Sequence, residues 1–280
     1  MQNQKTNHVI TIGGQKGGIG KSFITRGILE LLLPEIPIRL CETDPIRQAN
    51  KLIRYTYPDF SAKKHLQIRA FDIREKTEGI IEGFNTIFEN HWIPEGHTSG
   101  VTLVDLAAGT DWETLDCKET LQCFEFFQEG QKSHHLHIIV VNTAEDTDKI
   151  REITQYTTDP SVEFVVVLNS YPNYKGSPKR KEILEIAEKL NITVLEMPKL
   201  FEKTAEWMRT VESPELWKRG DSLTEIKEKG YIPVPLMQIG NNWKHFTSSI
   251  DRRNLQAIIQ WWRLWKKNKE AIMQMLSEKD

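Results

Sequence analysis

Residues 13–22, with the sequence GGQKGGIGKS, constrain the fold of this chain more than any other stretch. They follow an apolar run at 8–12 and precede a segment of helical period at 23–33. Glycines let a backbone curl closely around an anion with its N–H groups pointing inward, at the positive end of the helix that follows. The order of strand, glycine turn and helix therefore predicts a phosphate-binding loop.

Two residues at the end of this loop have a direct use on a nucleoside triphosphate. Lys21 would reach the β and γ phosphates, and the Ser22 hydroxyl would bind Mg²⁺. The strict pattern G-x-x-x-x-G-K-[ST] requires glycine at position 15, where this chain has Gln15, so the loop is a variant of that pattern. The residues expected to bind the nucleotide here are Gln15, Lys16, Gly17, Gly18, Ile19, Gly20, Lys21, Ser22 and Phe23.

Length and composition indicate one principal α/β domain with an extension. A chain of 280 residues can hold a doubly wound domain of about 200 to 250 residues. With 37 basic and 39 acidic residues the net charge is −2, which argues against binding nucleic acid through overall charge. Cys41, Cys117 and Cys123 follow no C-x-x-C spacing, and the sequence contains no run of about 18 apolar residues. The first residues show no leader pattern, so we expect none to be present. We expect a reducing, cytoplasmic setting.

Strand and helix patterns alternate along the rest of the chain. Apolar runs predict strands at 36–42, 66–71, 101–105, 136–141, 162–168 and 192–195. Helical spacing predicts helices at 46–55, 76–90, 146–156 and 179–190. Alternation of this kind is typical of right-handed βαβ units. We therefore predict a doubly wound α/β fold of the P-loop type, with a mainly parallel sheet flanked by helices, over residues 1–228. An irregular segment and a helix would follow at 229–280.

Acidic residues stand where two of the predicted strands end. Glu42 and Asp44 belong to E-T-D-P at 42–45, and Asp105 ends an apolar strand before the glycine-containing turn L-A-A-G-T-D. The carboxyl ends of strands in open α/β sheets face the ligand crevice. Glu42 and Asp44 are thus placed to meet Mg²⁺ and an attacking water, and Asp105 is placed near the metal. Asp44 could instead only cap the helix that follows it.

The loop resembles a known variant. Q-K-G-G-x-G-K-[ST], with a lysine before the double glycine, resembles the deviant Walker A motif of the ParA and MinD partition and positioning ATPases, whose signature lysine would be Lys16. The resemblance covers about residues 8–210. It extends to 42–45, where that family has D-x-D-P and this chain has Glu42 first, and to 105–111, which resembles the switch II segment. Asp44 matches the acid implicated in hydrolysis.

The resemblance implies a functional cycle. ATP and Mg²⁺ would be bound, with Lys16, Lys21 and Asp44 catalytic and Ser22, Glu42 and Asp105 on the metal. Asn169, at the end of the strand at 162–168, would hydrogen-bond the adenine, or else be only a turn residue. Pro198 would lie near the base. ATP would drive a sandwich homodimer that binds a matrix such as DNA, and an adaptor protein would stimulate hydrolysis.

Two other functions stay open. A metabolic enzyme of the same loop class, such as a dethiobiotin-synthetase-like ligase, would transfer a phosphoryl group to a small acceptor. A MinD-like positioning protein would place its C-terminal segment on anionic lipid. Lys16 and the Asp-Pro step favour an ATPase of the ParA/MinD type over the metabolic enzyme, and they do not distinguish partition from membrane positioning.

The C-terminal segment predicts one long amphipathic helix. Ser248 and Asp251 form a capping-box start. At 100° per residue, nine apolar side chains fill an arc of roughly 160°: Leu255, Ile258, Ile259, Trp261, Trp262, Trp265, Ile272, Met273 and Leu276. Between Arg252 and Lys269 the charged residues are all basic. The helix could pack on the main domain, grip DNA phosphates or lie at a membrane interface.

Three histidines, His134, His135 and His137, resemble a metal cluster at first sight. They lead directly into a predicted strand, where His135 and His137 share a face. No acid or cysteine joins them at a spacing typical of metal ligands. We therefore expect a structural role for them.

Overall fold

The computed structural model describes residues 5–14, 20–43, 65–71, 83, 86–89, 91–112, 114–115, 133–142, 147–157, 162–169, 178–199, 204 and 252–277. Several predicted features lie outside these residues. They are the loop at 15–19, the helix at 46–55, most of the helix at 76–90, the capping residues Ser248 and Asp251, and the boundary between 1–228 and 229–280.

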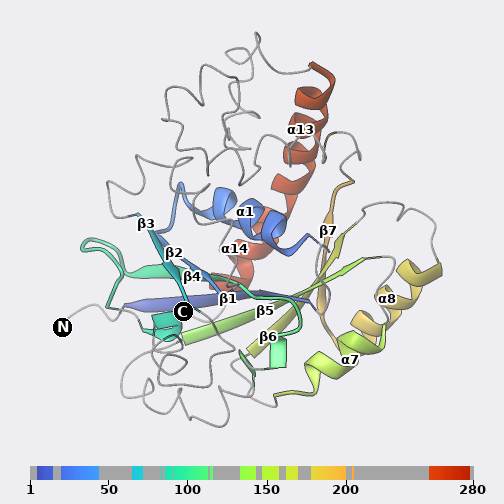
Figure 1. Cartoon of the computed structure of the whole chain (residues 1–280), viewed down its shortest axis with the longest axis horizontal. Coiled ribbons are helices and arrows are strands. Elements are labelled where there is room, and N and C mark those ends of the chain that lie inside the picture. The colour runs from blue at the N-terminus through green and yellow to red at the C-terminus, as the bar shows by residue number, and fades with distance from the viewer. Residues whose placement is uncertain are drawn as a thin grey trace.

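A seven-stranded parallel sheet forms the centre of the molecule (Figure 1). Its strands are β1 (Thr6–Gly13), β2 (Ile38–Glu42), β3 (Leu66–Ala70), β4 (Ser99–Asp105), β5 (Ser133–Asn142), β6 (Val162–Asn169) and β7 (Thr193–Met197). Their order is β3-β2-β4-β1-β5-β6-β7, and every neighbouring pair is parallel. The chain winds to one side of β1 and then to the other, so the carboxyl end of β1 lies where the winding reverses. Open α/β sheets bind their ligands at this position.

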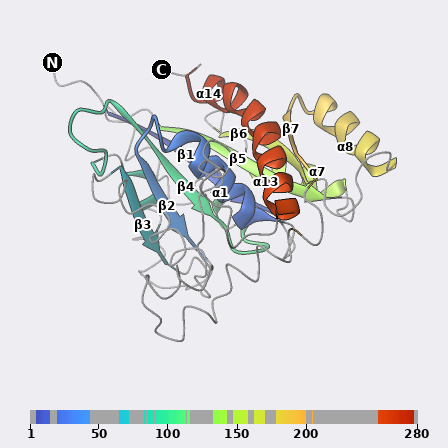
Figure 2. The same ribbon diagram turned by 90° about the horizontal axis from the view of Figure 1, so that it is seen from above.

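Helices cover both faces of the sheet. One face carries α1 (Lys21–Leu32) and the C-terminal helices α13 (Arg252–Trp265) and α14 (Lys269–Ser277), which lie beside α1 (Figures 1 and 2). The opposite face carries α7 (Asp148–Thr154) and α8 (Pro178–Lys189). Successive strand residues point to opposite faces, so Ile10 and Ile12 of β1 pack with α1 while Val9 packs with Phe88. The predicted doubly wound α/β fold is confirmed.

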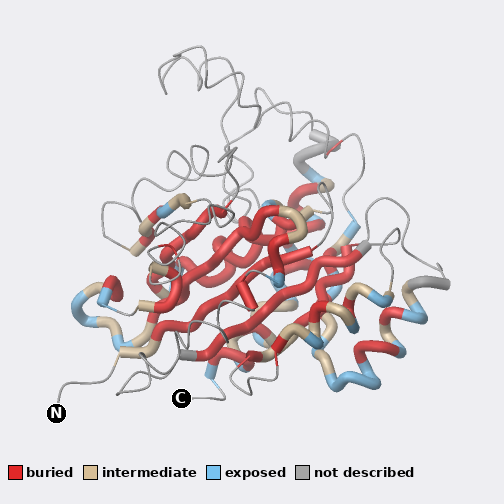
Figure 3. Tube along the Cα trace, turned by 60° about the horizontal axis from the view of Figure 1, so that its bottom comes forward, coloured by how far each residue is buried: buried red, intermediate tan, exposed pale blue. Residues whose placement is uncertain are grey.

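Burial explains why the strands could be predicted from apolar runs. β2 is buried at every position and β4 at all but its first residue, as Figure 3 shows for the centre of the molecule. A parallel sheet covered on both faces needs such strands. Helix α1 is also buried on nearly all sides, because the sheet and the C-terminal helices enclose it. Its buried Arg26 and Glu30 pair with each other, with 3.1 Å between Nε and Oε1.

The C-terminal helices belong to the same core as α1 and the sheet. Trp261 and Trp265 are 1% and 0% exposed. A Cβ atom at Gly27 of α1 would lie 2.6 Å from Trp265 Nε1, so this close approach requires glycine. Of the three possibilities that the sequence left open for this segment, the structure shows packing against α1 and the sheet. The predicted C-terminal helix is present, and the 3₁₀ turn η2 (Lys266–Asn268) divides it into α13 and α14.

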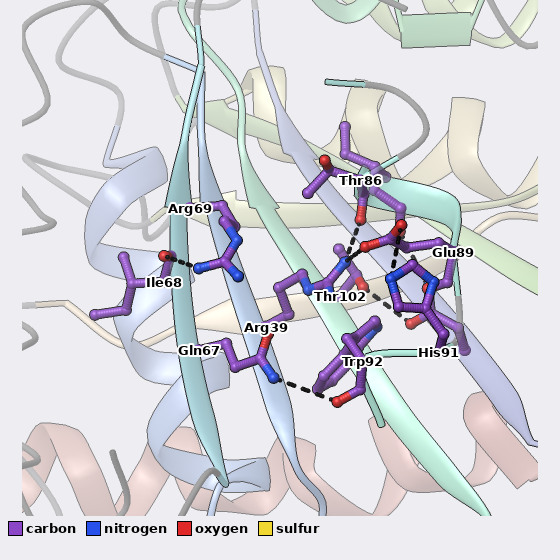
Figure 4. A network of polar contacts seen from close by, with 11 residues as sticks. Arg39, Gln67, Ile68, Arg69, Thr86, Glu89, His91, Trp92 and Thr102 are labelled. Atoms are coloured by element: carbon purple, nitrogen blue, oxygen red, sulfur yellow. Dashed lines mark hydrogen bonds and ion pairs between the residues drawn. The ribbon is translucent and has the colours of Figure 1, made fainter. Parts of the chain in front are cut away.

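A polar network lies toward the amino ends of the central strands, away from the loop (Figure 4). Arg39 Nη1 of β2 donates hydrogen bonds to Thr86 O at 2.7 Å and to Glu89 Oε1 at 2.5 Å. The Arg39 guanidinium carbon lies 4.9 Å from the centre of the Trp92 ring. Burial lowers the pKa of Arg39, and the hydrogen bond to Glu89 opposes that shift. Through these contacts Thr86, Glu89 and Trp92 are held against β2.

Cys41 lies in β2 beside this network and is fully buried. Burial raises the pKa of its thiol to about 12, so the thiol stays protonated at neutral pH and is a poor nucleophile or metal ligand.

Within the described part of the chain, no helix is both long enough and apolar enough to cross a membrane.

Candidate functional site

Gly20 is the last residue of the loop before α1 and forms the N-cap of that helix. Gly20 has φ 96° and ψ 16°, a left-handed conformation that glycine adopts without strain. A Cβ atom there would also lie 2.7 Å from Asn169 Nδ2. Asn169 ends β6 and is 5% exposed. The residue predicted to bind the adenine thus lies against the last glycine of the loop.

The first turn of α1 carries the predicted phosphate and metal contacts. Lys21 is 8% exposed, Ser22 is exposed and Phe23 is half-buried. This turn contains no acidic residue. The backbone N–H groups that begin a helix attract anions, and here no carboxylate of the first turn competes for them. The geometry therefore suits a phosphate group.

Two carboxylates stand side by side at the carboxyl edge of the sheet. Glu42 of β2 and Asp105 of β4 are partners in the strand register, and Asp105 also pairs with Ile12 of β1. Both acids are buried, at 3% and 7% exposed. The backbone N–H of Thr43 donates to Asp105 O at 3.1 Å, and the N–H of Ala107 donates to Thr43 Oγ1 at 2.9 Å. These contacts fix the two strand ends to each other.

The donor set fits Mg²⁺. Carboxylate and hydroxyl oxygens are the hard ligands that this ion prefers. No group of three or more His, Cys, Asp or Glu side chains within the described ranges is arranged to hold a metal by itself. An ion held by Ser22, Glu42 and Asp105 would therefore take its other ligands from phosphate oxygens and water, as Mg²⁺ at nucleotide sites does.

Helix α13 contacts both sides of the predicted nucleotide site. The indole N–H of Trp261 donates to the carbonyl of Pro198, with 2.9 Å between Nε1 and O. The Trp261 ring centre lies 4.7 Å from that of Phe23. Phe23 directly follows Ser22, and Pro198 directly follows β7. The predicted base-side residue and the start of α1 are therefore joined through one buried tryptophan.

Six of the predicted site residues lie outside the described part of the chain: Gln15, Lys16, Gly17, Gly18, Ile19 and Asp44. Their roles stay predictions. Those that are described converge on the carboxyl edge of the sheet. Gly20 lies against Asn169 at the end of β6, while Glu42 and Asp105 are paired on β2 and β4.

No protein-family model matches the chain, and no curated protein matches its sequence. Solved structures do resemble it. One is a nucleotide-binding protein from Archaeoglobus fulgidus in complex with ADP, with a TM-score of 0.43 and 18% identity over 68% of this chain and 81% of that chain. Another is a plasmid partition protein from Borrelia burgdorferi, with a TM-score of 0.39 and 13% identity over 69% and 89%.

A third is a chain of the MinC:MinD cell division protein complex from Aquifex aeolicus, with a TM-score of 0.37 and 16% identity over 92% of this chain and 94% of that chain. At these identities and TM-scores the three likenesses assign no function to this chain.

Sequence reasoning missed three residues at the start of the loop. The N–H of Gly14 donates to Asp111 Oδ2 at 3.1 Å, and His137 Nε2 lies 3.0 Å from Asp111 Oδ1. His137 Nδ1 lies 2.7 Å from Thr11 Oγ1. The only sequence signal was the presence of polar residues in two strands that a central sheet must bury. These residues are Thr11 in the first strand, and His135 and His137 two residues apart in the other. An acid does join the histidines in space, although it is distant in sequence.

Proposed function

We propose that this chain is an ATPase of the ParA/MinD type, which binds Mg·ATP, forms a homodimer around the nucleotide and hydrolyses ATP to partition or position DNA or another cargo. One observation carries the proposal. A left-handed glycine caps α1 immediately before Lys21 and Ser22, at the same sheet edge as the Glu42–Asp105 pair and Asn169. Side chains suited to a phosphate, a metal and a base therefore lie at one edge of the sheet, which supports the proposal.

The residues divide the work of binding. The Lys21 ammonium and the N–H groups of the first turn of α1 would hold the phosphates. Ser22 would bind Mg²⁺, with Glu42 and Asp105 on its other side, and the bound ion would neutralise charge on the phosphate oxygens. Asn169 and the Pro198 segment would hold the adenine, which leaves the γ phosphate directed at the acids.

Hydrolysis then needs a water in line with the bond that breaks. Asp44 would orient that water, whose oxygen bonds to the γ phosphorus while the bond from this phosphorus to the β–γ bridging oxygen breaks. The products are ADP and inorganic phosphate. Lys16 would add positive charge from the other subunit where the transition state gathers negative charge. A partner protein that improves this alignment would stimulate turnover.

Variants of Lys16 and Asp44 test the proposed cycle, because the two residues act at different steps. Lys16→Ala should keep ATP binding through Lys21 and the loop backbone, yet lose ATP-driven dimerisation and hydrolysis. Asp44→Ala should dimerise and accumulate with ATP trapped, because the charges between subunits persist while water is not oriented. Size-exclusion chromatography with light scattering, in ATP and Mg²⁺, distinguishes the two variants.

Two results would contradict the proposed cycle. They are a monomeric Asp44→Ala protein, and a Lys16→Ala protein that dimerises and hydrolyses ATP normally. Rapid turnover of ATP with a small metabolite and no protein partner would favour the metabolic ligase instead. ATP-dependent cosedimentation with anionic liposomes but not with DNA would favour the membrane-positioning protein.

The outward side of the C-terminal helix supports a DNA-binding variant of this proposal. Arg263, Lys266 and Lys267 are exposed there, while the tryptophans of the same helix are buried. Changing all three to alanine should weaken ATP-dependent DNA binding, and should lower the salt slope by about 0.9 for each DNA phosphate that the variant no longer neutralises. The matched control replaces three exposed basic residues on α7 and α8: Arg151, Lys181 and Lys189. Equally weakened binding in both triple variants would mean that net charge, and not this helix, sets DNA affinity.

A further inference from the structure

Four buried polar side chains form a hydrogen-bonded cluster under the start of the loop. They are Thr11 of β1, His135 and His137 of β5, and Asp111, and none is more than 1% exposed. Thr11 Oγ1 lies 2.9 Å from His135 Nε2 and 2.7 Å from His137 Nδ1. His137 Nε2 lies 3.0 Å from Asp111 Oδ1. The parallel register places Val9 opposite His135 and Thr11 opposite His137, so these side chains share one face.

The following arrangement of hydrogens satisfies every contact in the cluster. An ionised Asp111 only accepts, so His137 Nε2–H donates to it. His137 Nδ1 then accepts from the Thr11 hydroxyl, and Thr11 Oγ1 accepts from His135 Nε2–H. Both histidines are neutral in this arrangement. The chain of donors runs from β5 through β1 and ends on the carboxylate, which it orients.

The second oxygen of that carboxylate holds the loop. Asp111 Oδ2 accepts from the N–H of Gly14 at 3.1 Å, and the N–H of Gly109 donates to Gly14 O at 3.3 Å. A Cβ atom at Gly13 would lie 1.7 Å from Asp111 Oδ1, so only glycine leaves room for the carboxylate. The first residues of the loop are thus fastened on two sides to the segment that follows Asp105.

We propose that Asp111 is a positioning residue of the nucleotide site, oriented by His137 and Thr11. By holding the Gly14 N–H, it keeps the start of the phosphate loop in place relative to the segment that begins at Asp105. A loop held in its binding shape before ATP arrives loses less conformational freedom on binding, which raises affinity. The proposal rests on the proposed function, since the ligand of the loop is taken to be ATP.

Two threonines give a matched pair of variants. Thr11→Val and Thr102→Val each replace a fully buried strand hydroxyl by a methyl group. Thr102 Oγ1 donates to Asn7 Oδ1 at 2.9 Å in the network of Figure 4, away from the loop. Both variants should be destabilised to a similar extent in urea, because each removes a buried hydroxyl that forms hydrogen bonds. Only Thr11→Val should also bind ATP more weakly, by about tenfold, a change typical of removing one hydrogen bond.

Gly13→Ala provides a second route to the same effect. Its backbone is that of a β-strand, which alanine adopts readily, but the added methyl group would displace the Asp111 carboxylate. If Gly13→Ala acts through Asp111, the double variant Gly13→Ala/Asp111→Ala should bind ATP as tightly as Asp111→Ala alone. Asp111→Asn should lose less ATP affinity than Asp111→Ala. Its carboxamide oxygen can accept from Gly14 while its NH₂ group donates to the other tautomer of His137.

ATP affinity, kcat and KM are measured for the full chain of each variant, together with hydrogen exchange of the Gly14 amide without nucleotide. Faster exchange and weaker ATP binding in Thr11→Val, with Thr102→Val like the wild type, support the proposal. If both Thr11→Val and Gly13→Ala have the ATP affinity and the Gly14 amide exchange rate of the wild type, the positioning role of Asp111 is overturned. The proposed function would still stand. A wild-type protein that binds no ATP refutes the proposed function itself, and this positioning role with it.

Discussion

Lys21→Ala should remove measurable ATP binding. The side chain is the first of α1 and is 8% exposed, so its ammonium group would meet the triphosphate with little water between them. Removing one partner of a buried charge pair costs about 3–5 kcal/mol, because the other charge stays desolvated. This corresponds to an affinity that is at least roughly a hundredfold weaker. Hydrolysis should fall with binding, since the same lysine contacts the phosphate that is transferred.

Titration calorimetry with ATP and Mg²⁺ measures this change directly. The control is Lys189→Ala, which removes the same charge from an exposed position at the end of α8 and should leave affinity unchanged. Thermal unfolding without nucleotide checks that both proteins are folded. If Lys21→Ala bound ATP as tightly as the control, the loop at 13–22 would not be the nucleotide site.

The strands were predictable because a parallel sheet covered on both faces needs apolar, β-branched runs. In β5 the apolar run predicts only part of the strand. Its apolar residues predicted a strand at 136–141, yet the strand begins at Ser133 and includes three histidines. Hydrogen bonds to Thr11 and Asp111 make two of these histidines compatible with burial. Such pairing depends on strand register, which no local pattern contains.

Some features of the candidate site were also predictable from the sequence, and one was not. Glu42, Asp105 and Asn169 were predictable because each stands at the end of its own strand, and strand ends of a parallel sheet meet at one edge. The contact from Asp111 to Gly14 was not predictable, since 97 residues separate the two. It depends on the path of the chain after β4, and the sequence there shows only a glycine-containing turn.

The 3₁₀ turn between α13 and α14 lies among tertiary contacts. Residues 266–268 have the sequence KKN, which is compatible with a continuous helix. In the structure Asn268 Nδ2 donates to Glu196 O at 3.2 Å, and the Lys269 ammonium pairs with the Glu35 carboxylate. The 3₁₀ turn thus coincides with contacts to β7 and to the residues that follow α1. An apolar arc gives the buried face of a helix but not these contacts.

Trp265→Ala should be the most destabilising single change in the C-terminal helix. The ring is fully buried, stacks on Trp261 with centres 5.7 Å apart, and lies against Gly27 of α1. Truncating a buried tryptophan to alanine costs about 3–5 kcal/mol, through the transfer free energy of the removed atoms and the cavity that is left. A typical domain has about 5–15 kcal/mol in total, so the urea midpoint should fall sharply with little change in slope.

The neighbouring Leu264 supplies the matched control, because it is 41% exposed on the same helix. Leu264→Ala should change the free energy of unfolding by no more than about 0.5 kcal/mol. Trp265→Phe should be milder than Trp265→Ala, since phenylalanine keeps most of the apolar contact and removes an indole N–H that has no hydrogen-bond partner among the described residues. If Trp265→Ala and Leu264→Ala unfolded at the same urea concentration, the helix would not be docked on α1 in solution. Its tryptophans would then be free for the membrane interface that its amphipathic pattern also allows.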